Sequence, residues 1–386
     1  MTRALTFEAI SEARPGPAWK ARWDWSWPAY EAWFTARGGD AGPSRADCEA
    51  ALRRHLPELV PTWKALTALT GGSDRAARFL STWCPPAYLG GCSLAAVADE
   101  AQVRLVRNYD LSPDLNEGLL LRSEWCRPVM GMVEFLWGLS DGINDAGLAV
   151  ALAYGGSGVT REGFGITTIV RYLLETCDTV PQALAALERV PSHMAYNLVL
   201  ADRAGRTASV ELAAGGGGTR RSRAVAANHQ RAGVADRPAF TRTVERRACL
   251  TEMVDAQPRP DSLRARFLAA PLYQTGFDAG FGTLFTAEYD PATGGLTLAW
   301  PGESWSQRLD AFEEGRRTID YDTGRSRGDA PDRGTGTAAA PAFDALLQEA
   351  LSGEIDWLTF GQRLAAGDGW TAWQGAETPP SAQRQH

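Results

Sequence analysis

One short segment of this 386-residue chain combines a nucleophile with a permissive backbone, Gly90-Gly91-Cys92-Ser93. A lone cysteine is most often a small buried hydrophobe, but two preceding glycines allow backbone conformations that are closed to other residues. The segment stands where a tryptophan-rich region gives way to strand-like sequence, and the next run brings Arg107 and Asp110. These features single out Cys92 as a candidate nucleophile.

Histidines are scarce in the chain, which bears on how such a thiol could lose its proton. A Cys–His or Ser–His mechanism would have to recruit His55, His193 or His229, because the remaining histidine is the C-terminal residue. None of the six cysteines forms C-x-x-C, and no histidines show H-x-H or H-E-x-x-H spacing, so we expect no metal site. We therefore consider first a mechanism that needs no histidine.

A second candidate nucleophile is Ser140, in Gly138-Leu139-Ser140-Asp141-Gly142, which matches the esterase motif G-x-S-x-G. That motif requires a strand before it and a helix after it. A strand over 133–137 is plausible, but another turn and apolar run follow, so we interpret the pentamer as a strand-to-turn connection. The glycine runs 155–158 and 215–218 lack the lysine of a phosphate-binding loop and indicate loops.

Composition limits the class of protein. The chain is 44% hydrophobic and 22% charged, which excludes a disordered chain, a collagen and a coiled coil. No apolar run approaches the roughly 18 residues of a membrane helix, and Glu8 and Glu12 interrupt the apolar pattern of residues 1–15, unlike a secretory signal. A net charge of -7 disfavours nucleic acid. We expect a soluble, cytoplasmic protein with no membrane or nucleic-acid partner.

The elements that must position the candidate residues change in type at Cys92. Residues 1–91 hold half of the 14 tryptophans and two helical patterns, whereas hairpin signals dominate afterwards. This order predicts an α+β fold of antiparallel sheets covered by helices. We expect a helical segment 1–91, a catalytic body 92–321, a linker 322–340 and a helical segment 341–386. Within the body we expect strands at 93–98, 102–109, 118–122, 129–139, 148–154, 196–202, 207–212, 224–227, 284–289 and 296–300, and helices at 166–175, 181–189, 240–254 and 262–269.

Several segments carry a family resemblance through their joint order. They are Gly91-Cys92-Ser93, Arg107-Asn108-Tyr109-Asp110, residues 142–148, residues 196–202 with Gly205, Ala227-Asn228-His229, residues 243–246 with Leu250, residues 283–285 and residues 294–300. In this order they resemble the N-terminal-nucleophile hydrolases of linear amides. The closest branch is the acyl-CoA:6-aminopenicillanate (isopenicillin N) acyltransferase-like peptidases, with carcinine hydrolase as a relative and bile-salt hydrolases and penicillin V acylases as distant kin. The resemblance spans roughly residues 90–302.

The resemblance implies a four-layer αββα sandwich and a precursor that cleaves itself between Gly91 and Cys92. The amine released at Cys92 would then act as the base for its own thiol. An α-amino group has a pKa near 8, so part of it is neutral at pH 7, and no histidine is required. The same resemblance implies a small linear amide as substrate, a thioester intermediate, and no cofactor apart from acyl-CoA as a conceivable co-substrate.

The resemblance also implies roles for particular side chains. Arg107 would donate hydrogen bonds to the thiolate, and Asp110 would orient the α-ammonium group. Asn228 and a backbone N–H near Tyr154 would form the oxyanion hole. Arg246 would face the substrate or the thiolate, and its neighbours Arg242 and Arg247 compete for that role.

Three points stay open at this stage. The two cleavage fragments are expected to form a heterodimer, since seven tryptophans favour a retained 1–91 fragment, and further homo-oligomerisation is undecided. Water or an amine could take the acyl group. Two other readings remain: a serine esterase that uses Ser140, and a degenerate member of the fold that binds small molecules without catalysis.

Overall fold

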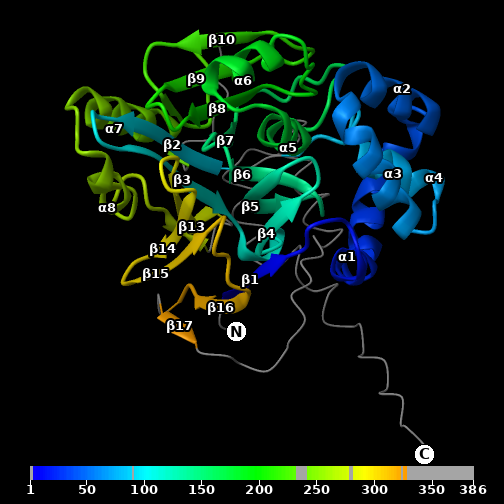
Figure 1. Cartoon of the computed structure of the whole chain (residues 1–386), viewed down its shortest axis with the longest axis horizontal. Helices are drawn as coiled ribbons and strands as arrows, with labels where there is room; N and C mark the ends of the chain where they lie inside the picture. The colour runs from blue at the N-terminus through cyan, green and yellow to red at the C-terminus, as the bar shows by residue number, and fades with distance from the viewer. Residues whose placement is uncertain (1–2, 89–90, 232–240, 278–280, 323–324, 328–386) are drawn as a thin grey trace, which may run out of the picture.

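A computed structural model describes residues 3–88, 91–231, 241–277, 281–322 and 325–327 of the chain. Two β-sheets face each other in this part of the chain, and helices cover their outer faces (Figure 1). No helix among the described residues is both long enough and apolar enough to cross a lipid bilayer.

The larger sheet contains ten strands, in the order β10-β9-β8-β7-β6-β5-β4-β1-β16-β17. Its neighbouring strands are antiparallel, except that β1 runs parallel to β4. The strands are β1 (Ala4–Ser11), β4 (Leu119–Glu124), β5 (Pro128–Glu134), β6 (Gly138–Asn144), β7 (Ala149–Tyr154), β8 (Tyr196–Ala201), β9 (Thr207–Leu212), β10 (Gly218–Arg221), β16 (Gly315–Asp320) and β17 (Arg325–Arg327).

The smaller sheet contains seven strands, and the hairpin that carries Cys92 lies inside it. Its order is β11-β2-β3-β13-β14-β15, and the short β12 pairs with β13. All of its pairs are antiparallel. The strands are β2 (Gly91–Ala98), β3 (Val103–Leu111), β11 (Val225–Ala226), β12 (Thr275–Gly276), β13 (Phe281–Asp290), β14 (Gly295–Trp300) and β15 (Glu303–Arg308).

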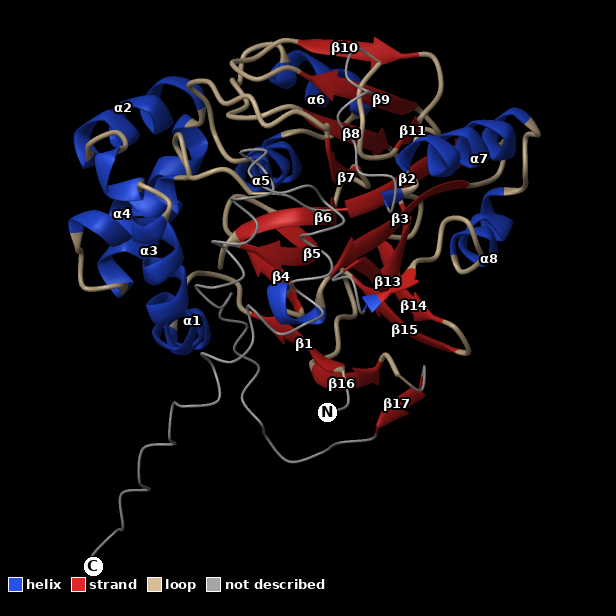
Figure 2. Cartoon of the chain, turned by 180° about the vertical axis from the view of Figure 1, so that it is seen from behind, coloured by secondary structure: helices blue, strands red, loops and turns tan. Residues whose placement is uncertain are grey.

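In the described part of the chain, eight α-helices lie outside the two sheets, as can be followed in Figure 2. Helices α1 to α6 lie on the side of the larger sheet, whereas α7 and α8 cover the smaller sheet. They are α1 (Pro17–Ala36), α2 (Arg45–His55), α3 (Val60–Leu69), α4 (Asp74–Ser81), α5 (Ile166–Thr176), α6 (Val180–Leu187), α7 (Thr243–Asp255) and α8 (Leu263–Phe267).

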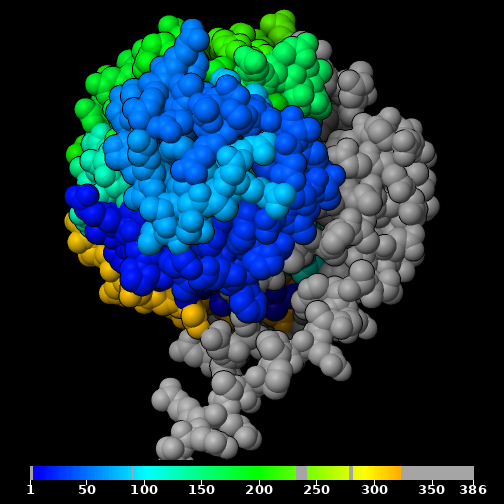
Figure 3. Space-filling view, turned by 90° about the vertical axis from the view of Figure 1, so that its right-hand side faces the viewer, coloured from blue at the N-terminus to red at the C-terminus, as the bar shows by residue number. Residues whose placement is uncertain are grey.

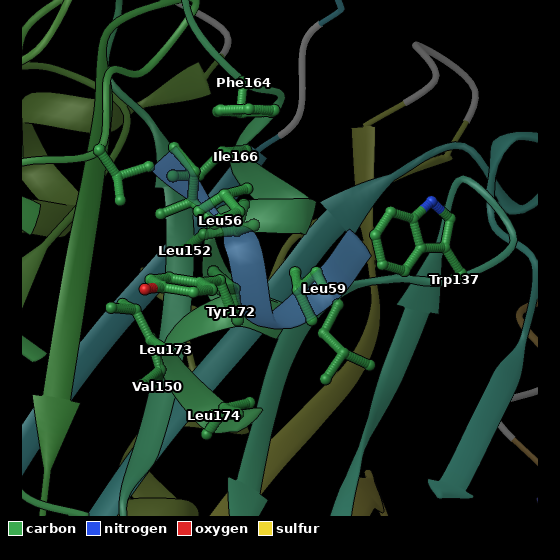
Figure 4. Close-up of a cluster of buried hydrophobic side chains, with 14 of the residues drawn as sticks. Leu56, Leu59, Trp137, Val150, Leu152, Phe164, Ile166, Tyr172, Leu173 and Leu174 are labelled. Atoms are coloured by element: carbon green, nitrogen blue, oxygen red, sulfur yellow. The ribbon is translucent and has the colours of Figure 1, made fainter. Parts of the chain in front are cut away.

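Three hydrophobic cores separate the layers. One core lies between the sheets and includes Phe7 of β1 and Phe285 of β13. Another lies between the larger sheet and its helices, where Ile166 and Leu173 of α5 meet Leu152 of β7 (Figure 4). The third lies between the smaller sheet and helices α7 and α8. Since each sheet is buried on both faces, the molecule has the predicted αββα order of layers.

The N-terminal region is joined to this body more closely than its helical pattern predicts. Residues 1–91 were expected to be helical, but β1 pairs with β4 on one side and with β16 on the other. The alternation of Leu5, Phe7 and Ala9, all buried, explains this strand. Helices α1 to α4 follow and form one face of the molecule (Figure 3). The prediction of an all-helical segment is therefore wrong at its start.

One predicted strand is in fact a hairpin. Residues 129–139 were expected to be continuous, but the chain reverses between β5 and β6. Phe135 and Leu136 adopt positive φ values of 56° and 68° at this turn, a conformation that bulky residues seldom adopt. The predicted linker lies almost entirely outside the described residues, and the predicted C-terminal helical segment 341–386 lies wholly outside them.

Candidate active site

Cys92 lies at the beginning of β2, paired with Tyr109 of β3. Side chains alternate between the two faces of a strand, so Cys92 and Tyr109 point into the core between the sheets. Asn108 and Asp110, two residues apart on β3, point to the opposite face of the sheet. There the Asn108 amide donates to the carbonyl of Phe267 in α8. Arg107 and Asp110 therefore approach the cysteine from opposite faces of the sheet.

The thiol of Cys92 lies against the guanidinium of Arg107. Nη2 of Arg107 donates to Cys92 Sγ at 3.2 Å, and both residues are fully buried. The ring of Tyr109 lies 4.3 Å from the guanidinium carbon. Burial raises the pKa of the thiol to about 11, although Arg107 opposes this shift. This raised pKa favours the protonated thiol at neutral pH.

A β-bulge in the larger sheet fixes the position of Arg107. Met132 pairs with Asp141 and Val133 with Leu139, so Ser140 is the extra residue of β6. As a result two consecutive side chains reach the same arginine nitrogen. Nη1 of Arg107 donates to Ser140 Oγ at 2.8 Å and to Asp141 Oδ2 at 2.9 Å.

Arg246 of α7 holds the main chain of the nucleophile from the opposite face. Its Nη1 donates to the Cys92 carbonyl at 2.6 Å and to Ser93 Oγ at 2.9 Å. It also lies 3.4 Å from Asp110 Oδ2. Of the three competing arginines, Arg242 is paired with Glu245 and Arg247 with Glu211. The geometry therefore selects Arg246, which contacts the cysteine carbonyl, whereas the thiol contact belongs to Arg107.

The amide of Asn228 is oriented by two donors. Its Oδ1 accepts from the Cys92 N–H at 2.9 Å and from Arg246 Nη2 at 2.8 Å. Because both partners are donors, this end of the amide must be the oxygen. The Nδ2 group faces the carbonyl of Tyr154 at 3.4 Å. The two residues assigned to the oxyanion hole therefore meet, but the contact in the uncleaved chain is made by the carbonyl of Tyr154, and the predicted oxyanion role stays a prediction.

Asp110 is buried beside the Gly91–Cys92 peptide bond. It pairs with Gly91 across the hairpin, and its Oδ1 accepts a hydrogen bond from Thr283 Oγ1 at 2.7 Å. Burial raises the pKa of this carboxyl, while Arg246 and Thr283 act against the rise. Thr283 and Arg246 thus hold the carboxyl on the face of the hairpin opposite to the thiol.

Gly91 is required here by close packing. A Cβ atom at this position would lie 2.2 Å from the ring of Phe281 and 2.8 Å from the Asp110 carbonyl oxygen. The sequence suggested that the glycines supply unusual backbone angles, but Gly91 shows no positive φ among the described residues. The absence of a side chain at Gly91 is the property that the fold uses.

Comparison with known proteins identifies the family. A sequence model described as acyl-coenzyme A:6-aminopenicillanic acid acyl-transferase matches residues 97–305, more than half of the 386 residues. The chain belongs to this acyl-transferase family. The match includes Arg107, Asp110, Asn228 and Arg246, but it begins just after Cys92. The assignment of the nucleophile therefore rests on geometry and on the resemblance of the residues around it.

Several solved structures are similar to this acyl-transferase family member. A mutant conjugated bile acid hydrolase from Clostridium perfringens is 12% identical, with 58% of this chain and 96% of that chain covered and a TM-score of 0.38. Penicillin V acylase from Agrobacterium tumefaciens is 14% identical, with 59% and 91% covered and a TM-score of 0.39. A Caenorhabditis elegans N-acylethanolamine-hydrolyzing acid amidase ortholog is 14% identical, with 52% and 93% covered and a TM-score of 0.40. No curated protein matched.

The Ser140 alternative finds no support in this acyl-transferase fold. Ser140 is buried within β6, where its hydroxyl accepts from Arg107 and faces the Met132 carbonyl. A nucleophile elbow needs a strand-to-helix turn, and this residue lies inside a strand. Two of the histidines make hydrogen bonds to residues other than Ser140. His229 contacts Thr243, and His193 contacts the carbonyl of Arg161.

Residues to which the sequence analysis gave no role lie around the candidate site of this acyl-transferase family member. Asp141 neutralises Arg107 and accepts a hydrogen bond from the Tyr289 hydroxyl at 3.0 Å. Thr283 supports Asp110. Glu134 ends β5 beside the Arg107–Tyr109 stack, and burial raises its pKa to about 7. The described residues contain no group of three or more His, Cys, Asp or Glu side chains that could hold a metal ion.

Proposed function

We propose that this protein is a self-cleaving cysteine amidohydrolase or acyltransferase that acts on a small linear amide. The arrangement of four side chains around one residue carries the proposal. Arg107 contacts the sulfur of Cys92, Asn228 its nitrogen and Arg246 its carbonyl oxygen, while Asp110 lies across the hairpin. An ordinary buried cysteine would not need this set of partners.

Maturation would begin with attack of Cys92 Sγ on the Gly91 carbonyl carbon. The peptide C–N bond then breaks, the nitrogen takes up the thiol proton, and a thioester joins Gly91 to the sulfur. Water then hydrolyses the thioester, which leaves a carboxylate on Gly91 and returns the thiol to Cys92, whose amine stays free. Asn228 contributes by holding the departing nitrogen through the N–H···Oδ1 hydrogen bond.

In the mature enzyme the amine of Cys92 would take the proton from its own thiol. Arg107 stabilises the resulting thiolate through Nη2, and Asp110 orients the ammonium group. The thiolate attacks the substrate carbonyl, and Asn228 with a backbone N–H near Tyr154 would stabilise the negative oxygen. The amine product leaves with the proton, and the acyl group remains as a thioester on Cys92.

The decisive test is the mass of the purified protein. Wild-type protein should yield fragments 1–91 and 92–386, and the larger fragment should begin with Cys-Ser-Leu. Cys92→Ala should give one uncut and inactive chain, whereas Cys126→Ala, which changes an exposed cysteine, should be cleaved normally. Cleavage at residue 91 in Cys92→Ala would refute the proposal.

Water and an amine are alternative acceptors for the same thioester. Incubating the mature protein with an amide and a second amine separates the two reactions, because transfer gives a new amide and hydrolysis gives a free acid. The same assay with an acyl-CoA in place of the amide tests for a thioester donor. The Gly91–Cys92 cleavage test does not depend on which acceptor is used.

A further inference from the structure

Tyr289 is a fully buried tyrosine whose hydroxyl reaches across the core between the two sheets. It lies on β13 of the smaller sheet, where it pairs with Leu105 of β3. Its hydroxyl donates to Oδ1 of Asp141 at 3.0 Å, and Asp141 belongs to β6 of the larger sheet. Burial and the charge of Asp141 raise the pKa of this phenol. The hydroxyl therefore keeps its proton near neutral pH and remains a donor.

Tyr289 and Arg107 project from the same face of the smaller sheet. Arg107 pairs with Ala287, which is two residues before Tyr289 on β13, and residues two apart on a strand share a face. Such diagonal neighbours lie within reach of long side chains. Both side chains end at the same carboxylate, because Nη1 of Arg107 donates to Oδ2 of Asp141 at 2.9 Å. Asp141 is therefore held from two neighbouring strands, one oxygen by each.

The division of the two Asp141 oxygens decides what Arg107 offers to the thiol. An arginine and a carboxylate often form a bidentate pair through two parallel hydrogen bonds. Here Oδ2 accepts from Nη1 of Arg107, while Oδ1 accepts from Tyr289. The second terminal nitrogen, Nη2, donates to Cys92 Sγ at 3.2 Å. Without the phenol, both oxygens would be free to turn toward the guanidinium, and Nη2 would be shared between the carboxylate and the sulfur.

The charges around the sulfur make this contact important. Arg107 favours the thiolate of Cys92, whereas the charges of Asp110 and Glu134 oppose it. Cys92, Arg107 and Asp141 are fully buried, so water screens their interactions weakly. Hydrogen bonds to charged groups are strong in such surroundings. A small change in the direction of the guanidinium should therefore change the fraction of thiolate.

Resting on the proposed function, we propose that Tyr289 is a positioning residue for the reaction of Cys92: by binding one oxygen of Asp141 it keeps the Arg107 guanidinium directed at the sulfur. Tyr289 acts through these two residues and takes no part in the bonds that form and break. Its loss should therefore change the reactivity of the thiol while the fold is retained.

Tyr289→Phe removes the donor and keeps the ring. The readout is the rate at which iodoacetamide labels Cys92 as a function of pH, followed on the peptide that contains Cys92. Because the thiolate is the reactive form, this rate follows the fraction of thiolate. We expect the midpoint of the profile to move up by about one pH unit, with about tenfold slower labelling at pH 7. An unchanged profile, or a move to lower pH, would overturn the proposal.

Tyr321→Phe is the matched control. It removes a hydroxyl that donates to the main-chain carbonyl of Leu284 at 2.8 Å. Its profile should coincide with that of the wild type, and a shift equal to that of Tyr289→Phe would overturn the proposal. Cut and uncut chains give different Cys92 peptides, so each is compared with the same peptide of the wild type. A wild-type chain that is never cut refutes the proposed function but still gives a profile for Cys92, so the two failures are distinguishable.

A second replacement decides the matter if Tyr289→Phe fails to fold or to be cut. 3-Fluorotyrosine at position 289 keeps the hydroxyl and makes it a stronger donor, because fluorine makes the phenol more acidic. Asp141 then draws less on Arg107, so the labelling profile should move to lower pH. The same replacement at position 321 should leave the profile unchanged. No shift at position 289, or a shift to higher pH, would overturn the proposal.

Discussion

Arg107 performs two tasks that depend on the fork shape of its guanidinium group. One nitrogen donates to Cys92 Sγ and the other to Ser140 and Asp141. Lysine keeps the charge but cannot make both contacts. We expect Arg107→Lys to slow self-cleavage by about tenfold or more, because a hydrogen bond to a charged group contributes about 1.5–3 kcal/mol. Time-resolved intact-mass measurement checks this.

Arg104→Lys is the matched control for that experiment. Arg104 lies on the same strand but forms an ion pair with Asp290 at 3.0 Å, away from the thiol. Its replacement should leave the cleavage rate near that of the wild type. Cleavage of Arg107→Lys at the same rate as Arg104→Lys would contradict a role for the arginine–sulfur contact.

Glu134 predicts a pH dependence of stability. Its pKa rises from an ordinary value of 4.5 to about 7 in the folded chain, chiefly because of burial. The folded state therefore keeps a proton that the unfolded state loses first, so the stability contributed by this group falls as pH rises from about 4.5 to about 7. Glutamine is neutral throughout. We expect the stability of Glu134→Gln relative to wild type to increase between pH 5 and pH 8 in urea denaturation. A constant difference over that range would contradict the raised pKa.

At the scale of elements, the ring of Phe281 in β13 reaches across β3 to Gly91 at the start of β2. We expect Gly91→Ala to slow cleavage strongly, since its Cβ would meet the Phe281 ring and the Asp110 carbonyl. Gly158→Ala is the control, because nothing lies within 4 Å of a Cβ there. Intact mass over time gives both rates. A second change, Phe281→Ala, should restore part of the rate, and normal cleavage of Gly91→Ala alone would exclude the packing argument.

The elements also show what the sequence can and cannot predict. The hairpin of β2 and β3 follows from alternation around a short turn, and it places Cys92 opposite Tyr109. The turn between β5 and β6 has no such signal, because Phe135 and Leu136 adopt positive φ without a glycine or asparagine. Glu134 precedes that turn, so its place beside the site could not be anticipated.

Strand pairing explains why local sequence patterns did not indicate the contacts of the other residues near the site. Asp141 contacts Arg107 through a bulge that depends on register between β5 and β6. Thr283 reaches Asp110 from a strand 173 positions away. Local patterns carry no information on such contacts. Arg107, Asp110, Asn228 and Arg246 were identified because each belongs to a short motif of a known family, and their convergence on Cys92 needed the structure.

At the scale of the whole molecule, the cleavage fragments should stay together. Fragment 1–91 would contribute β1 to the interior of the larger sheet and buried Trp19, Leu52 and Trp63 to the core beneath it. Separating the fragments would expose this apolar surface and break pairing with two strands. We expect both fragments to co-elute in size-exclusion chromatography and to separate only in denaturant. A folded 92–386 fragment that elutes alone would contradict this prediction.

The pairing of β1 with β16 also sets the order of events during synthesis. Leu5 faces Ile319 in this ladder, so β1 finds this neighbour only after more than three hundred further residues have been translated. The pairing of β1 with β16 in the ten-stranded sheet can therefore form only after β16 has been synthesised. If Cys92 reacts only after β1 and β16 have paired, a nascent chain stalled before β16 should remain uncleaved.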